Sequence, residues 1–265
     1  MRCLRRKGFS FREIARQLDT SVKTAWKYGK EITFSKTGKY RYETEVDGIK
    51  KKIAEQKENV TKEKARIMAH LLFDGSLFRN EYHYTIRYTN AFEPLVHEFL
   101  KDMSIVYGLD NPYWKVSDGE KWYRVTYRSK EAYKDLLSFV PSFFSCDDVF
   151  EIPLAIMESD KSIQLEILRA FWRDEGSIAS DGKLTSELRN ERIIDQLKIL
   201  HKKFNLNPHV AQYIDRGTDS YKLYFPKESE ILEKFHKLDI FGPSIVTRGA
   251  HAGRKKAHVL MDFLE

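Results

Sequence analysis

Residues 61–75 read TKEKARIMAHLLFDG and residues 162–176 read SIQLEILRAFWRDEG, and these two stretches share one pattern. Each begins with a polar residue that can cap a helix, continues with apolar residues at helical spacing, and ends in an acidic residue followed by glycine. In both cases Gly-Ser and a large apolar residue follow, at Gly75-Ser76-Leu77 and at Gly176-Ser177-Ile178. A pattern that recurs after about 100 residues indicates an internal repeat.

The repeat extends well beyond these two helices. Each is followed by alternating strand-like residues, a helix, an Asn-Pro pair, two further strands and a Lys-Glu pair that starts a last helix. In the first half these are 82–89, 92–107, Asn111-Pro112, 113–116, 122–127 and Lys130-Glu131. In the second half they are 178–185, 192–204, Asn207-Pro208, 210–214, 221–225 and Lys227-Glu228. The order α-β-β-α-β-β-α predicts an α+β fold of two pseudo-symmetric repeats, at 61–140 and 162–265, joined by a linker at 141–161.

These residues resemble the LAGLIDADG homing endonucleases, in the form that carries two motifs on one chain. The nine-residue signature covers IMAHLLFDG, which ends at Asp74-Gly75, and LRAFWRDEG, which ends at Glu175-Gly176. The first copy departs from the signature at His70 and Phe73. The resemblance implies that the strands of both halves form a saddle over the DNA major groove. It also implies that the two motif helices pack side by side, with small residues, Ala69 and Ala170, at their contact.

The resemblance further implies that Asp74 and Glu175 are catalytic carboxylates that hold the metal. A carboxylate at the negative end of a helix dipole, facing a second carboxylate, is stabilised by a divalent cation. Hard oxygen ligands suit Mg²⁺, and we expect two or three divalent ions shared between the two carboxylates. We expect each motif glycine to take the left-handed conformation that ends a helix. Asp174 is one residue, about 100°, around the helix from Glu175, so we expect a solvated or interface residue there and not a ligand.

Members of this family also carry a basic residue near each scissile phosphate. In the second half, the stretch GPSIVTRGAHAGRKKAHVL (242–260) offers Lys255 and Lys256 for this role, with Arg254 and Arg248 as phosphate contacts. The corresponding stretch of the first half, SFVPSFFSCDDVFEIPLAIMES (138–159), offers only acids: Asp147, Asp148, Glu151 and Glu158. The two halves are therefore unequal, which leaves double-strand cleavage, nicking of one strand and loss of cleavage all open.

Positive charge is concentrated at the N-terminus. Residues 1–60 contain 16 Lys and Arg against 8 Asp and Glu, whereas residues 61–265 contain 30 against 31. A basic module joined to a nearly neutral body favours a polyanion as partner, with nucleic acid as the default. A surface that only keeps the protein soluble is the alternative.

Residues 1–30 contain two short amphipathic helices. Ser10, with Glu13 three residues on, has the capping-box arrangement, and Ser21 can cap a second helix at 22–30. The string GFSFREIARQLDTSVKTAWKY resembles the helix-turn-helix of resolvase-like and transcriptional DNA-binding domains. In that reading Val22, Ala25 and either Tyr28 or Trp26 pack back, and the residues facing the major groove are Lys23, Thr24 and Lys27. The alternative is an ordinary helical hairpin. Residues 31–60 read as a basic linker that ends in a charged helix at 46–57.

Basic residues are also concentrated in the strand segments of the repeats. Segments 76–90, 111–129, 177–190 and 208–227 contain 11 Lys and Arg against 7 acids. Together with Arg254, we take seven of these residues as DNA-binding candidates: Arg79, Arg87, Arg124, Arg128, Lys183, Arg189 and Lys222. The strand register decides which of them share a face, because a shift of one residue turns every side chain over.

Composition and motifs exclude several other classes. With 42% hydrophobic and 13% aromatic residues, the 265-residue chain can build a packed core. No apolar run approaches the roughly 18 residues of a membrane span, and the N-terminus has no signal-peptide core, so we expect a cytoplasmic protein without a membrane partner. The cysteines, Cys3 and Cys146, form no CxxC pair, and the histidines form no metal-binding cluster. A GxxxxGK[ST] loop is absent, so no nucleotide cofactor is expected.

The sequence therefore favours a sequence-specific, Mg²⁺-dependent endonuclease that acts on double-stranded DNA as a monomer. The alternative is a DNA-binding transcriptional regulator that uses the same scaffold without cleaving. A third possibility that the resemblance allows is an intron RNA maturase, for which the sequence carries no separate signal.

Overall fold

The chain folds into two units, Met1–Glu55 and Gln56–Glu265, each with buried apolar residues of its own. The computed structural model describes residues 1–33, 35, 47–53, 60–81, 83–117, 122–143, 150–247 and 249–264. In these ranges no helix is both long enough and apolar enough to cross a membrane.

The N-terminal unit contains three short helices, α1 (Arg2–Arg6), α2 (Phe11–Gln17) and α3 (Val22–Gly29). The predicted caps are confirmed. Ser10 and Glu13 form a complete capping box at the start of α2, and the Ser21 hydroxyl accepts a hydrogen bond from the Thr24 backbone N–H at the start of α3. A small core holds the helices together, made of Ile14, Ala15 and Ala25 with Met1, Leu4, Phe9 and Phe11 packed against it.

The packing of α3 differs from the sequence prediction. Ala25 is buried as expected, but Val22, Trp26 and Tyr28 are exposed, with Trp26 at 51%. The inward position one turn after Ala25 is taken by Gly29, where an added Cβ would lie 2.9 Å from the Phe11 ring. The ring of Phe11 occupies the space predicted for an aromatic residue of α3. Residues 47–53 form a further helix, and the remaining residues of the predicted charged helix at 46–57 lie outside the described ranges.

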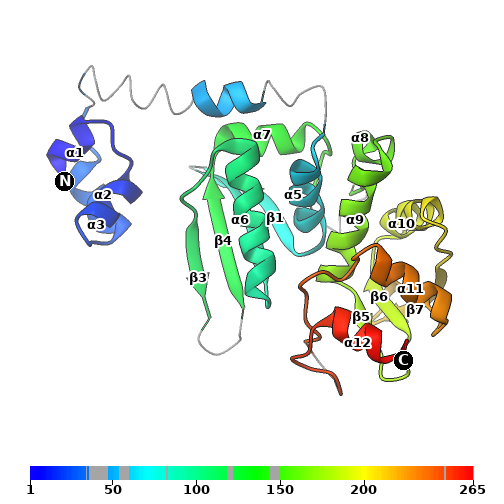
Figure 1. Cartoon of the computed structure of the whole chain (residues 1–265). Coiled ribbons are helices and arrows are strands. Elements are labelled where there is room, and N and C mark those ends of the chain that lie inside the picture. The colour runs from blue at the N-terminus through cyan, green and yellow to red at the C-terminus, as the bar shows by residue number, and fades with distance from the viewer. Residues whose placement is uncertain are drawn as a thin grey trace. The chain divides into compact units, whose positions relative to one another are not determined.

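The second unit consists of two repeats with the same order of elements (Figure 1). The first contains α5 (Lys62–Phe73), β1 (Gly75–Arg79), β2 (Tyr84–Asn90), α6 (Glu93–Tyr107), β3 (Tyr113–Val116), β4 (Tyr123–Arg128) and α7 (Lys130–Leu137). The second contains α9 (Lys161–Asp174), β5 (Ser177–Ile178), β6 (Leu184–Leu188), α10 (Glu191–Lys203), β7 (His209–Asp215), β8 (Thr218–Phe225) and α11 (Ser229–Lys237). Two further helices are α8 (Leu154–Met157), before the second repeat, and α12 (Lys256–Asp262), after it.

The two sheets have equivalent topologies. Their strand orders are β1-β2-β4-β3 and β5-β6-β8-β7, and all described pairs are antiparallel. The predicted α+β fold of two pseudo-symmetric repeats is therefore confirmed. One strand prediction was wrong: 178–185 is not continuous, because a turn separates β5 from β6 and Gly182 within it has a φ of +83°.

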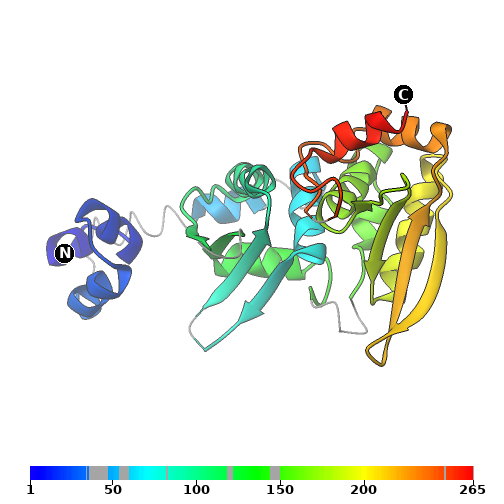
Figure 2. The same ribbon diagram turned by 90° about the horizontal axis from the view of Figure 1, so that it is seen from below.

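Helices α5 and α9 pack against each other in the middle of the unit, and the sheets lie on either side of them (Figures 1 and 2). Ala69 and Ala170 are buried on these helices. Helices α6 and α7 pack on the first sheet, and α10 and α12 on the second. On these faces lie the buried side chains of alternate strand residues, such as Ile86 and Leu223. Each sheet therefore has a second face for other contacts.

The motif glycines serve a purpose different from the predicted one. Neither Gly75 nor Gly176 has a positive φ, so neither closes its helix in the left-handed conformation. They are needed for close approach: an added Cβ at Gly75 would lie 2.6 Å from Leu71 Cα, and one at Gly176 would lie 2.4 Å from the Trp172 carbonyl oxygen. A side chain at either position would therefore push the following strand away from the end of its helix.

Candidate active site and nucleic-acid interface

Asp74 and Glu175 are the C-cap residues of the two packed helices α5 and α9. Both side chains line a cavity of about 400 Å³, together with Asn90, Asp174 and Lys256. Residues 244–247, from the segment between α11 and α12, line the same cavity. The equivalent ends of the two motif helices and the C-terminal segment thus contribute to one acidic site.

The two carboxyl groups are half-buried and influence each other. Burial raises the pKa of Asp74 to about 7, with a further contribution from the charge of Asp174. Burial and then the charges of Asp74 and Asp174 raise the pKa of Glu175 to about 8. Two carboxyl groups held in this way bind a proton near neutral pH, and a cation would relieve the same repulsion.

Lys256 is the lysine among the described residues that line the cavity, and Arg173 lines it as well. Its Nζ donates hydrogen bonds to the carbonyl oxygens of Trp172 (3.1 Å) and Arg173 (2.9 Å), in the last turn of α9. Burial lowers the pKa of Lys256 to about 8, although the three neighbouring carboxylates oppose this shift.

Lys255, the other predicted candidate, is exposed at the N-cap of α12, and Arg254 forms an ion pair with Asp262 at 2.6 Å. Arg248 lies outside the described ranges.

Asp174 is an interface residue and is not solvated, since its side chain has 0% exposure. Its Oδ1 accepts hydrogen bonds from the Tyr88 hydroxyl (2.8 Å) and from Asn90 Nδ2 (3.1 Å). Its Oδ2 lies 2.7 Å from Nδ1 of His70 on the opposite motif helix. Of the two alternatives that the sequence left open for Asp174, a solvated or an interface residue, the structure supports the second, because α5 covers this side of α9. The departure from the signature at His70 was the signal that could have revealed the partner.

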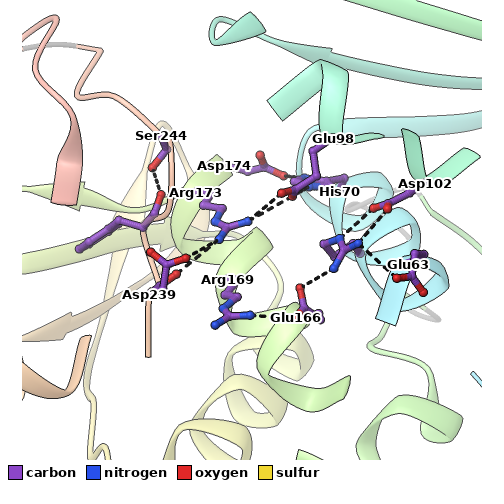
Figure 3. A network of polar contacts seen from close by, with 12 residues as sticks. Glu63, His70, Glu98, Asp102, Glu166, Arg169, Arg173, Asp174, Asp239 and Ser244 are labelled. Carbon is purple, nitrogen blue, oxygen red and sulfur yellow. Dashed lines mark hydrogen bonds and ion pairs between the residues drawn. The ribbon is translucent and has the colours of Figure 1, made fainter. Parts of the chain in front are cut away.

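A buried polar network continues from His70 along the contact between the helices (Figure 3). Nε2 of His70 lies 3.5 Å from Glu98, which binds Arg173 at 3.1 Å. Burial lowers the pKa of His70, but the charge of Asp174 and contacts with Glu98 outweigh it and raise the pKa to about 9. His70 is therefore an imidazolium at neutral pH.

A second buried bridge lies further along the same helices. Arg66 of α5 donates two hydrogen bonds of 2.8 Å to Asp102 and binds Glu166 of α9 at 3.1 Å. Glu166 also accepts a hydrogen bond of 2.9 Å from Arg169 (Figure 3). The Arg66–Glu166 pair crosses the contact between the two repeats, and we infer that it helps to fix how α5 and α9 are aligned.

The two helix-end carboxylates are suitable ligands for a divalent cation. Among the described residues, no group of three or more His, Cys, Asp and Glu side chains is arranged to hold a metal ion. A complete protein cage is not what Mg²⁺ requires, because it commonly takes one or two carboxylates and completes its shell with phosphate oxygens and water. Asp74 and Glu175 would supply that pair.

The strand register divides the predicted DNA-binding residues of the first sheet. Thr85 pairs with Arg128, Arg87 with Thr126, and Thr89 with Arg124, so these three arginines share one face. Lys115, which pairs with Arg124, lies on it as well. Arg79 pairs with Tyr84 and alternates with Leu77, which assigns it to the helix-covered face. The register therefore places Arg79 on the face opposite to that of the other three arginines of this sheet.

The cations of the first sheet face have no acidic partners in the part of the chain that the structure describes. Arg124 donates to the Thr89 hydroxyl, and Arg128 contacts the His83 ring at 3.2 Å. Arg87 stacks over Phe78. Their charges are therefore not neutralised within the described residues.

The second sheet differs, because each of its predicted DNA-binding cations has an acidic partner. Lys183 binds Asp181 at 2.8 Å, and Arg189 lies 3.5 Å from Asp215. Lys222 lies 3.7 Å from Glu187, its cross-strand neighbour. The predicted DNA-binding cations of the two repeats thus differ, because those of the second have acidic partners.

Not all of the residues of α3 predicted to contact DNA have free side-chain groups. Lys23 and Lys27 are exposed. The Thr24 hydroxyl lies 2.8 Å from the Ser21 hydroxyl, so its hydrogen-bonding capacity is shared with the helix cap. Trp26 and Tyr28, one or the other of which was predicted to pack inward, are both exposed on the same helix as the two lysines.

Comparison with solved structures identifies the fold. The structure is similar to I-DmoI in complex with DNA and Mn, with a TM-score of 0.50 and 14% identity, over 68% of this chain and 97% of that chain. It is also similar to the N-terminal LAGLIDADG domain of DUF199/WhiA (TM-score 0.45, 19% identity, 74% and 91% of the chains). A third similar structure is the homing endonuclease I-WcaI bound to its DNA recognition sequence (TM-score 0.42, 13% identity, 69% and 84%).

No protein-family model matches the sequence, and no curated protein matches it. The likeness is one of fold, which is that of the LAGLIDADG homing endonucleases, as the sequence predicts.

Proposed function

We propose that this protein is a sequence-specific, divalent-metal-dependent endonuclease that hydrolyses phosphodiester bonds of double-stranded DNA as a monomer. The observation that carries the proposal is the pair Asp74 and Glu175, one at the end of each central helix and both lining one cavity. A structural ion pair does not explain these two residues, because burial, and then the charges of nearby carboxylates, raise the pKa of both groups. Carboxyl groups whose pKa is shifted by burial and by specific charged neighbours in a cavity are typical of a functional site.

Asp74 and Glu175 would hold the metal, and Mg²⁺ is the ion that suits their oxygen ligands. When bound, such an ion polarises the scissile phosphate, lowers the pKa of an attacking water and stabilises the leaving oxygen. Lys256 would hold its ammonium group near the phosphate, oriented by the carbonyls at the end of α9. At about pH 8 this lysine exists in both protonation states, so it can accept or donate a proton.

DNA binding is supported by the face that carries Arg87, Arg124, Arg128 and Lys115, whose charges lack acidic partners in the described ranges. Such cations release counterions when they contact phosphates. The N-terminal unit would add a helix-turn-helix contact through Lys23 and Lys27 of α3. I-DmoI, whose structure is similar, was solved in complex with DNA.

The alternative function is a non-cleaving DNA-binding transcriptional regulator on the same scaffold. It is favoured by the inequality of the two halves, because Lys256 is the one lysine among the described residues that line the cavity. A site with a single lysine also makes nicking of one strand a possible outcome of the enzymatic proposal.

One experiment separates these functions. The wild-type protein and the variants Asp74→Asn and Glu175→Gln are incubated with a plasmid library of random sites and Mg²⁺. Both variants keep the size of the side chain and remove its negative charge. Metal-dependent cleavage or nicking by the wild type, lost in both variants, supports the endonuclease. Tight binding to a defined site without any metal-dependent product would contradict it and support the regulator.

A further inference from the structure

Asn90, the last residue of β2, connects two carboxylates of the site. Its Nδ2 donates to Oδ2 of Asp74 at 2.9 Å and to Oδ1 of Asp174 at 3.1 Å. Its Oδ1 accepts a hydrogen bond of 2.8 Å from the backbone N–H of Phe92. Because only the amide oxygen can accept from a backbone N–H, this contact fixes which end of the amide faces the carboxylates.

Asp174 is itself held on three sides. The Tyr88 hydroxyl and Asn90 donate to one oxygen, and the imidazolium of His70 occupies the other. The side chain has no exposed surface. A carboxylate whose two oxygens are both engaged in this way is a fixed acceptor and is poorly suited to bind a metal ion.

We propose that Asp174 and Asn90 are positioning residues that orient the Asp74 carboxylate toward the metal. The inference rests on the proposed function of Asp74 as a metal ligand. Asp174 fixes the amide of Asn90, and the amide fixes Oδ2 of Asp74, so that Oδ1 is presented as the ligand atom. Supporting residues of this kind limit the rotation of a ligand before the metal arrives.

Glu175 lacks a comparable support. The residue of the second sheet that corresponds to Asn90 is Leu188, since these residues end β2 and β6 and pair with Tyr123 and Tyr221. No side-chain hydrogen bond to Glu175 is found among the described residues. The two proposed ligands are therefore unequal, because Asn90 holds Asp74 by a hydrogen bond and no side-chain hydrogen bond in the described ranges holds Glu175.

The test measures Mn²⁺ binding to the metal-free full-length protein without DNA, by the relaxation of water protons. Asn90→Leu introduces the residue that the second repeat carries at this position. We expect it to weaken Mn²⁺ binding about 10-fold, the lower end of the range for loss of a supporting contact to a metal ligand. Asp174→Asn should weaken binding to a similar extent. The double variant should bind Mn²⁺ no more weakly than either single variant, because Asp174 acts on Asp74 only through Asn90.

Two further variants control for effects on folding. Gln196→Leu removes an amide that bridges the backbone N–H and carbonyl of Ile152, outside the cavity, and should leave Mn²⁺ affinity unchanged. If Asp174→Asn fails to fold, Tyr88→Phe takes its place. This variant removes one of the three contacts that hold Asp174, so it should weaken Mn²⁺ binding less, by about 2-fold to 3-fold.

The outcomes separate this inference from the proposed function. Unchanged Mn²⁺ affinity in Asn90→Leu, with reduced affinity in Asp74→Asn, would overturn the positioning role and leave the metal site in place. Additive losses in the double variant would also overturn it. No Mn²⁺ binding by the wild type at millimolar concentration, or equal binding by Asp74→Asn and Glu175→Gln, would overturn the metal site itself.

Discussion

Nδ1 of His70 lies 2.7 Å from Oδ2 of Asp174, and neither side chain is exposed to solvent. The pair joins the two motif helices. The pseudo-symmetric equivalents of His70 and Asp174 are Phe171 and Phe73, so a polar pair at one position corresponds to an apolar pair at the other. A buried charge is costly unless its partner is present. The contact between the repeats therefore depends on both residues together.

Removal of one partner of this pair should destabilise the protein more than removal of both. His70→Leu leaves Asp174 as a buried carboxylate without its cation, and we expect a loss of about 3–5 kcal/mol in the free energy of unfolding. The double variant His70→Leu/Asp174→Ala removes both charges and should regain a large part of this loss. Urea denaturation measures each value. A double variant as unstable as the sum of the single variants would contradict the prediction.

An exposed ion pair is the matched control. Lys237 and Glu233 lie 2.9 Å apart on α11, and both are largely exposed. Lys237→Ala should change the free energy of unfolding by less than about 0.5 kcal/mol.

The stability of the metal-free protein should fall as pH rises. The pKa of Asp74 is raised to about 7 and that of Glu175 to about 8, whereas carboxyl groups of an unfolded chain ionise near pH 4. Between these values the native state holds protons that the unfolded state has released, so deprotonation favours unfolding. His70 also makes the protein less stable as pH rises. The stabilisation by its positive charge is complete below its unfolded pKa of about 6.5 and is lost as pH rises through its folded pKa of about 9.

Thermal melts across this pH range test the prediction. Asp74→Asn and Glu175→Gln should each flatten the fall of Tm between about pH 5 and pH 8, because each removes one titrating group. Mg²⁺ should raise Tm of the wild type more at the upper end of this range, where the carboxylates are free of protons. Glu230→Gln, at an exposed residue of α11, is the control and should leave the slope unchanged. If Asp74→Asn and Glu175→Gln keep the wild-type slope of Tm against pH, the raised pKa of these two carboxyl groups is contradicted.

The first sheet should contribute more to the salt dependence of DNA binding than the second. Arg87→Ala and Arg124→Ala each remove a cation without an acidic partner in the described ranges, and each lost phosphate contact should reduce the slope of log K against log salt by about 0.9. Lys183→Ala and Arg189→Ala should have smaller effects, because Asp181 and Asp215 already neutralise these cations. Arg79→Ala, on the helix-covered face, is a further control. Fluorescence anisotropy over a salt series measures all five variants, and equal slopes would contradict the asymmetry.

The sequence was sufficient to predict the repeat because periodicity and capping are local. Ser10, Glu13 and Ser21 cap their helices as predicted, and β3 has the predicted bounds. Properties that depend on a distant partner could not be predicted in this way. The inward orientation of Asp174 requires α5, the face of Arg79 requires the register with β2, and the neutralisation of Lys222 requires Glu187 on a neighbouring strand.

Loss of the Lys256 charge should affect cleavage and not DNA binding. Lys256→Met keeps most of the length of the side chain and removes the ammonium group. We expect hydrolysis of one strand to slow by about 100-fold, the lower limit for a positioned proton donor or acceptor. A duplex with a different label on each strand resolves the two rates. Lys255→Met, at the exposed neighbouring residue, should leave both rates unchanged. An equal decrease on both strands would mean that Lys256 supports the fold of the site and serves neither strand in particular.

The lysines of α3 should extend the protected DNA site. Lys23 and Lys27 are exposed on the helix that a helix-turn-helix would insert in the major groove. The double variant Lys23→Ala/Lys27→Ala should shorten the footprint on a selected site and reduce its salt dependence, because two cations are lost while the core of Ile14 and Ala25 remains. Lys50→Ala is the control within the same unit, because Lys50 forms an exposed ion pair with Asp47 at 3.5 Å. An unchanged footprint in the double variant would mean that α3 does not contact DNA, and the binding site would then belong to the second unit alone.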